Sequence, residues 1–165
     1  MPLDTRKYML FNLLTDTGIT MENSSRIWIA EDDRSLRWVM EKALTRAGIG
    51  VRCFERGDHL LAALTQARPT VIISDVRMPG TDGLALLKRV EANFPEIPII
   101  ITTAHSDLDS AVSAYQGGAF EYLPKPFDIE ELIAVAKRAI AISKEKKGSM
   151  VETIAASKEI IGEAP

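Results

Sequence analysis

The stretch "IWIAEDDRS", residues 27–35, places three acidic residues directly after a short apolar run. The apolar part has the length and the β-branched content of a buried strand. Like charges crowded at a strand's end repel one another and normally weaken a fold. The stretch therefore raises the question of what Glu31, Asp32 and Asp33 are placed there to hold.

Strand-like runs recur along the chain and alternate with helical patterns. The runs are "RIWIA" (26–30), "VRCF" (51–54), "TVIIS" (70–74), "PIIITT" (98–103) and a weaker "FEYL" (120–123). Between them and after the last, apolar residues recur at the three- and four-residue spacing of an α-helix face. Near-continuous apolar strands are typical of a sheet covered on both faces, so we expect parallel strands in an α/β sandwich.

The patterns also indicate how the chain is organised. We expect an unstructured extension at 1–24, one α/β domain at 25–146 and a linker at 147–165, because "SKEKKG" (143–148) looks like a charged helix end. The start, "RKYMLFNLL" (6–14), faintly resembles a signal peptide. Its apolar run is short and is not followed by a small-residue cleavage site, so an extension is the better interpretation.

Composition excludes several functional classes. The 165 residues are 46% apolar and 26% charged, which suits one soluble domain with tails. Twenty basic and 23 acidic residues give a net charge of -3, so we expect neither direct nucleic-acid binding nor attraction to an anionic membrane. Cys53 is the single cysteine, which rules out an internal disulfide and fits the reduced cytoplasm.

Polar residues stand at the ends of successive predicted strands. The acidic triplet follows the first strand, Asp75 follows the third, Thr103 ends the fourth and Lys125 follows the fifth. Ligands of open parallel sheets bind beyond the carboxyl ends of the strands, so these groups are expected to meet at one edge. Oxygen ligands suit Mg²⁺, and a carboxylate beside that ion can attack phosphorus to form an aspartyl-phosphate. A lysine and a hydroxyl can hold the remaining phosphoryl oxygens.

Each residue taken alone has a simpler explanation. Asp32 or Asp33 can cap the helix that begins near Ser35, Asp75 can open the turn "MPGTDG" (78–83), and a single lysine is usually solvated. Their occurrence together at one edge is the argument for a site. Two rival site types are excluded, because the turn "EDDRS" has no glycine for a dinucleotide and the chain has no P-loop pattern.

Four motifs together resemble the response-regulator receiver family over residues 26–146. They are "EDD" (31–33), "SDVRMPGTDG" (74–83), "TTAHSD" (102–107) and "YLPKPF" (122–127). The resemblance implies a flavodoxin-like (βα)5 sandwich with strand order 2-1-3-4-5. Segments such as "SLRWVMEKAL" (35–44) and the ending "IIGEAP" (160–165) further resemble the NtrC-type nitrogen regulators, which are transcriptional activators.

The resemblance also implies the metal site and the partners. Asp75 would be the phosphoacceptor, Asp33 a direct Mg²⁺ ligand and Asp32 a weak ligand or a support for metal-bound water, with the backbone carbonyl of Arg77 completing the shell. Glu31 is interpreted as strand-end solvation and not as a ligand. The expected partners are a sensor histidine kinase and the regulator's own AAA+ ATPase and DNA-binding domains, which are not in this chain; a homodimer is left open.

Phosphorylation is expected to act through a switch. Thr103 would hydrogen-bond the phosphoryl group, Lys125 would pair with it, and Tyr122 at the aromatic switch position would turn inward as the helix at 106–117 moves. Such a protein is not an enzyme, although it assists its own phosphorylation and slow dephosphorylation. A dedicated phosphohydrolase would need a second acid where Arg77 stands. The alternative is an interaction module that uses the fold without phosphate.

Overall fold

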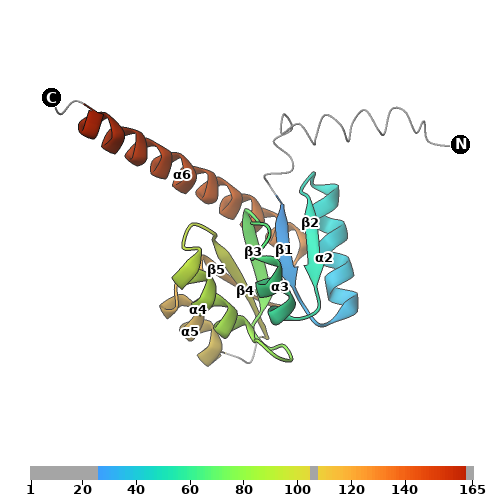
Figure 1. The fold of residues 1–165 in the computed structure, drawn as a ribbon. Coiled ribbons are helices and arrows are strands. Elements are labelled where there is room, and N and C mark those ends of the chain that lie inside the picture. The colour runs from blue at the N-terminus through green and yellow to red at the C-terminus, as the bar shows by residue number, and fades with distance from the viewer. Residues whose placement is uncertain (1–25, 105–107, 163–165) are drawn as a thin grey trace, which may run out of the picture.

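The computed structural model describes residues 26–104 and 108–162, and shows five strands that alternate with helices (Figure 1). The strands are β1 (Ile27–Ala30), β2 (Val51–Phe54), β3 (Val71–Asp75), β4 (Ile99–Ala104) and β5 (Glu121–Lys125). The helices are α2 (Arg34–Arg46), α3 (Gly57–Ala63), α4 (Gly83–Asn93), α5 (Leu108–Gln116) and α6 (Ile129–Gly162). The predicted alternation is confirmed.

All neighbouring strands are parallel, and their order in the sheet is β2-β1-β3-β4-β5. This confirms the flavodoxin-like (βα)5 receiver sandwich. The order places β1 and β3 side by side at the centre, with Ala30 opposite Ser74. The first acidic residues after β1 therefore emerge next to Asp75, the last residue of β3.

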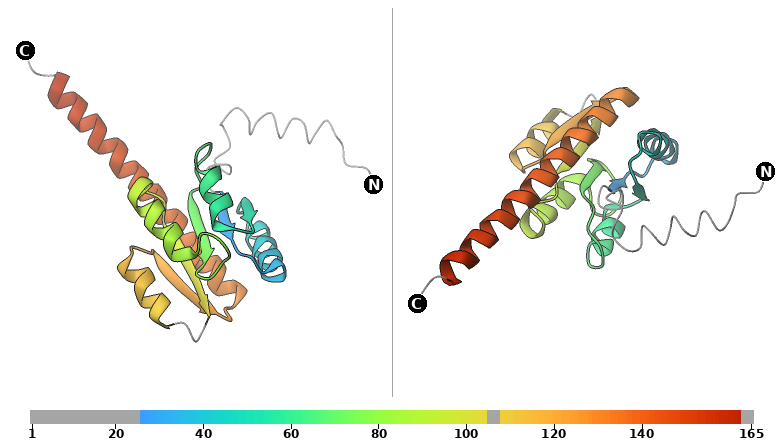
Figure 2. Two further views of the ribbon diagram at one scale, coloured as in Figure 1. Left: turned by 60° about the horizontal axis from the view of Figure 1, so that its bottom comes forward. Right: turned by 90° about the horizontal axis from the view of Figure 1, so that it is seen from above.

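Two apolar cores lie on the two faces of the sheet, which is why its strands are apolar on both sides. On one face, Leu60 of α3, Leu86 of α4 and Ala114 of α5 pack against the sheet. On the other, Met40 of α2 and Leu132 of α6 do so. The helices thus form two outer layers, as the turned views also show (Figure 2). Within the described part of the chain, no helix combines the length and apolarity needed to cross a bilayer.

Helix α6 is longer than the sequence pattern predicts. The expected helix end at 143–148 is wrong, because α6 continues without a break to Gly162 and projects beyond the sheet (Figures 1 and 2). The lysine, glutamate and alanine residues of this segment are good helix formers, and one interior glycine costs only about 1 kcal/mol. The expected extension at 1–24 lies outside the described residues, and the domain limits stay predictions.

The described side chains of helix α5 bury little apolar surface. Its inward-facing residues include Ala111 and Ala114, whereas Val112 and Tyr115 are about half exposed, at 48% and 49%. Small buried side chains contribute few dispersion contacts and little hydrophobic free energy. This agrees with the small apolar residues noted in the sequence of this helix.

Candidate functional site

Glu31 continues the path of β1 into the sheet edge. Its backbone N–H donates to the carbonyl of Phe54 at 3.0 Å, and its own carbonyl accepts a 2.7 Å hydrogen bond from Arg37 Nη1. These bonds hold the residue in an extended position, and its side chain is 1% exposed. The interpretation of Glu31 as strand-end solvation is therefore wrong.

Lys125, at the end of β5, joins two buried carboxylates. Its Nζ donates to Glu31 Oε1 at 2.8 Å and lies 3.1 Å from Asp75 Oδ2. Asp75 is 8% exposed, so both carboxylates are shielded from water. A buried carboxylate without a partner is costly, and Lys125 supplies that partner to both. The sequence places Lys125 at this edge correctly, next to Asp75.

The pKa values of Glu31 and Lys125 are both shifted by their surroundings. Burial, reinforced by the charge of Asp75, raises the pKa of Glu31 from 4.5 to about 7, although the hydrogen bonds from Lys125 and from the Asp33 backbone act in the opposite direction. For Lys125 burial favours the neutral amine, but the hydrogen bond and charge of Glu31, together with those of Asp75, outweigh it and raise the pKa. The site thus binds a proton more tightly than isolated carboxylates do.

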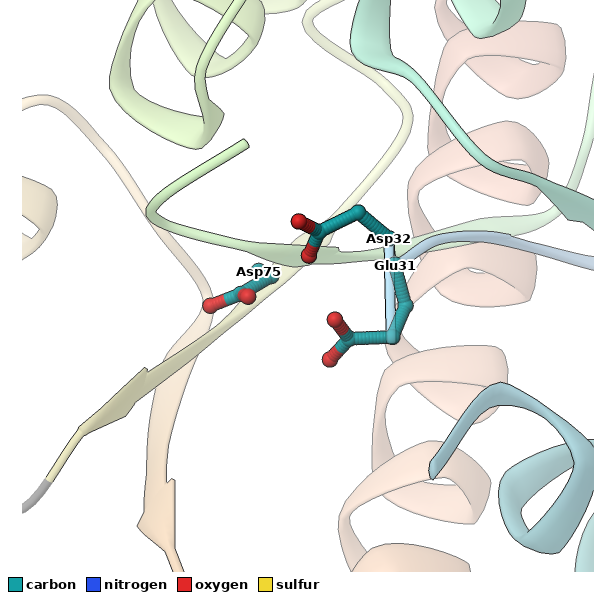
Figure 3. Close-up of side chains that lie close together, drawn as sticks. All are labelled: Glu31, Asp32 and Asp75. Atoms are coloured by element: carbon teal, nitrogen blue, oxygen red, sulfur yellow. The ribbon is translucent and has the colours of Figure 1, made fainter. Parts of the chain in front are cut away.

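Three carboxylates form one group at this edge. Ligand oxygens of Glu31, Asp32 and Asp75 all lie within 4.8 Å of one another. Figure 3 shows Glu31 and Asp32, which follow β1, directed toward the end of β3 that carries Asp75. Glu31 and Asp75 are buried whereas Asp32 is exposed. Hard oxygen donors with one side open to solvent are the arrangement that Mg²⁺ uses, because the ion keeps several waters.

Asp33 has a different place. It is the N-cap of α2, and its Oδ1 accepts a 3.1 Å hydrogen bond from the backbone N–H of Leu36. The structure does not bring it into the group formed by Glu31, Asp32 and Asp75. The simpler explanation of an acidic residue before this helix applies to Asp33, and the geometry favours Asp32 over Asp33 as the metal-facing residue.

The remaining predicted residues lie in β4, in β5 and in the connection after β3. Thr103, in β4, is 1% exposed and lies opposite Pro124 of β5 in the sheet. Arg77 stands two residues after Asp75 in the β3–α4 connection, and the role of its carbonyl stays a prediction. Tyr122 is half-buried, and its ring packs edge-to-face on Tyr115 of α5 with centroids 4.9 Å apart.

A further contact, which the sequence did not reveal, anchors α5. The hydroxyl of Tyr115 donates to Glu121 Oε1 at 2.9 Å, and Arg138 Nη2 of α6 lies 3.4 Å from Glu121 Oε2. Burial, then the hydrogen bond and charge of Glu121, raise the pKa of Tyr115. In the sequence, the only indication of this contact is a tyrosine six residues before a glutamate.

The fold and the site define a class of protein. Residues 27–137 match the family described as response regulator receiver domain, and the chain belongs to this family. Within it, the sequence is of the NtrC type. It is 53% identical over 140 residues to "DNA-binding transcriptional regulator NtrC" of Salmonella typhimurium, which covers 84% of this chain and 30% of that protein.

Solved structures of receiver domains agree with this placement. The apo receiver domain of nitrogen regulatory protein C is 57% identical, with a TM-score of 0.66, over 72% of this chain and 95% of that one. The BeF3-activated form of the NtrC receiver domain is 58% identical, with a TM-score of 0.62, over 70% and 93%. The chain spans about 30% of the length of the curated relatives that it matches.

Proposed function

We propose that this chain receives a phosphoryl group on Asp75 from a sensor histidine kinase, with Mg²⁺ bound beside it, and thereby switches a transcriptional activator. The observation that carries the proposal is the meeting of Asp75, Lys125 and two further carboxylates at the carboxyl edge of the sheet. Membership of the receiver family supports the same role. Control of nitrogen-related genes, in the cytoplasm, is proposed from the NtrC-type sequence.

The residues present fit a magnesium ion. Asp32 and Asp75 would be the protein's carboxylate ligands, with the Arg77 carbonyl beside them, and Glu31 lies within the same oxygen group. Glu31 and Asp75 are both buried and share the single ammonium of Lys125, so a cation bound beside them would reduce the repulsion that remains. When bound, Mg²⁺ neutralises charge on the transferring phosphoryl oxygens.

The chain's own residues perform the transfer. A carboxylate oxygen of Asp75 forms a bond to phosphorus while the bond from phosphorus to the donor's imidazole nitrogen breaks, so the phosphoryl group changes partner without any redox step. The ammonium of Lys125, 3.1 Å from Asp75 Oδ2, is placed to pair with the new phosphoryl oxygens. The Thr103 hydroxyl would donate to another of them. Because no second acid stands at position 77, hydrolysis of the product is expected to be slow.

The response is proposed to travel through α5. If the Thr103 hydroxyl moves toward the phosphoryl group, it would leave space for Tyr122, whose ring now packs on Tyr115. The buried residues of α5 whose side chains are described are Ala111 and Ala114, so a small differential free energy suffices to shift this helix. The ATPase and DNA-binding domains expected of such an activator would respond to that shift, with homodimerisation as a further element of the proposal.

The direct test is incubation with Mg²⁺ and a small phosphodonor such as acetyl phosphate, followed by intact mass measurement. The wild type is expected to gain one phosphoryl group, and Asp75→Ala none. Asp109→Asn, a change of an exposed acid in α5, is the matched control and should label like the wild type. Labelling that persists in Asp75→Ala would refute the assignment, and a wild type that gains no mass would favour the phosphate-independent interaction module.

A further inference from the structure

The connection between β3 and α4, residues 76–82, is closed at its base by a glycine. The backbone N–H of Gly83 donates to the carbonyl of Val76 at 3.0 Å. A Cβ at position 83 would overlap the carbonyl oxygen of Asp75 and would lie 2.8 Å from Val76 Cα. The loop therefore leaves the sheet at Asp75 and returns against the same residue.

The outer part of this loop rests on the first residues of α3 and on Arg56, which precedes that helix. A Cβ on Gly57 would overlap the carbonyl oxygen of Thr81, so the two backbones are in direct contact. Gly80 has a φ of +75°, and a Cβ there would overlap Arg56 Nη2 and lie 2.7 Å from Asp58 Oδ1. The α-carbon of Gly80 thus sits directly on the Arg56 and Asp58 side chains.

Those two side chains form an ion pair. Arg56 Nε lies 3.2 Å from both Oδ1 and Oδ2 of Asp58, and the two side chains are 40% and 45% exposed. Burial acts to raise the pKa of Asp58, but its own backbone N–H, Arg56 and the backbone N–H of Thr81 together lower it. Asp58 is therefore linked both to Arg56 and to the loop after Asp75. A pair this exposed contributes little to global stability, so its main effect is geometric.

We propose that Asp58 is a positioning residue, which together with Arg56 fixes the 76–82 loop and so aims the backbone carbonyl of Arg77 at the Mg²⁺ site. This inference rests on the proposed function, because it assigns a support to one of that site's ligands. Without the pair, the loop keeps its closure at Gly83 and the backbone contact between Thr81 and Gly57, but Gly80 loses the side chains on which it rests. Arg77 lies between the closed base of the loop and Gly80, and its carbonyl direction then becomes variable. Partners that orient a ligand typically change metal affinity by tenfold or more.

The experiment is a Mg²⁺ titration of the whole chain, followed by tryptophan fluorescence or calorimetry, with thermal unfolding of each variant without Mg²⁺. Asp58→Ala is expected to bind Mg²⁺ about tenfold more weakly, with little change in the melting temperature. Glu55→Ala removes a neighbouring exposed acid from the connection just before α3 and is the matched control, expected to bind like the wild type. Arg56→Gln, which keeps the Asp58 carboxylate, is the second variant should Asp58→Ala not fold, and is also expected to weaken Mg²⁺ binding.

The possible outcomes distinguish a failure of the positioning role from a failure of the proposed function. If the wild type binds Mg²⁺ and Asp58→Ala and Arg56→Gln bind it equally well, the positioning role is refuted while the proposed function stands. A variant that loses thermal stability but keeps the wild-type Mg²⁺ affinity also refutes the positioning role, because a purely structural contact would give that result. If the wild type fails to bind Mg²⁺ at all, the proposed metal site is refuted, and the positioning role with it.

Discussion

Replacing Asp32 and Asp33 separately distinguishes a metal ligand from a helix cap. The two residues are adjacent and both exposed, yet the structure gives them different partners. Asp32 shares an oxygen group with Glu31 and Asp75, whereas Asp33 accepts the backbone N–H of Leu36. We therefore expect Asp32→Ala to abolish or strongly weaken Mg²⁺ binding and Asp33→Ala to leave it intact. The effects on stability should be opposite in sign.

The magnitudes follow from these contacts. Loss of an aspartate N-cap costs about 1 kcal/mol, or roughly 3–5 °C in melting temperature for a domain of this size, so Asp33→Ala is destabilising. The carboxylates of Asp32, Glu31 and Asp75 lie within 4.8 Å of one another, a separation at which two unit charges in water repel by about 1 kcal/mol. Because Asp32 is exposed, the water value applies, and Asp32→Ala should stabilise the metal-free protein by about that amount.

The assay is urea or thermal unfolding with and without Mg²⁺. At a Mg²⁺ concentration of about 100 times the dissociation constant, binding stabilises a protein by roughly 2.7 kcal/mol. The wild type and Asp33→Ala should show this increment and Asp32→Ala should not. Asp33→Asn, which keeps the cap, is the control and should resemble the wild type in both respects. If Asp33→Asn loses the Mg²⁺ increment while Asp32→Ala keeps it, the assignment is reversed and the reasoning fails.

Three further changes test other parts of the site. Because burial raises the pKa of Glu31 from 4.5 to about 7, the folded metal-free protein holds a proton that the unfolded chain has lost, so stability should fall as pH rises through that window. Glu31→Gln should flatten this dependence in urea unfolding at pH 5 and pH 8, and an unchanged slope would contradict the shift. Tyr115→Phe removes the hydrogen bond to Glu121 and should cost less than about 1 kcal/mol while speeding amide exchange in α5; unaltered exchange would remove the anchoring role. Gly83→Ala forces a Cβ against Asp75 and should destabilise by about 1–3 kcal/mol in urea unfolding, so a neutral result would mean that the loop yields easily.

The fold could be predicted because its signals are strong and local. Runs such as residues 70–74 and 98–103 are almost wholly apolar, and glycines or turn residues separate them from helical patterns. The edge of the sheet at which Asp75 and Lys125 meet follows from parallel strands alone. These parts of the prediction depend on hydrophobic burial, which the residue types predict directly.

The residue types alone could not predict which member of the acidic triplet faces the site and which caps the helix. This assignment depends on where the strand stops and the helix begins, and a shift of one residue moves every side chain to another position. The backbone N–H of Glu31 still donates to the Phe54 carbonyl beyond the end of β1, so Asp32 reaches the group around Asp75 and Asp33 becomes the cap. The length of α6 was missed for a related reason, because charged helix formers and one glycine look like an end when only the local pattern is considered.

The bridge formed by Lys125 means that the carboxylates of this site carry their own counter-ion. A divalent cation at the proposed site would compete with the ammonium, which lies 2.8 Å from Glu31 and 3.1 Å from Asp75. We therefore expect its apparent affinity to be lower than the number of carboxylates suggests, because the exchange consumes part of the binding free energy. A phosphoryl group on Asp75 would offer the displaced ammonium a new anion, so the cation and the phosphoryl group should each favour the binding of the other.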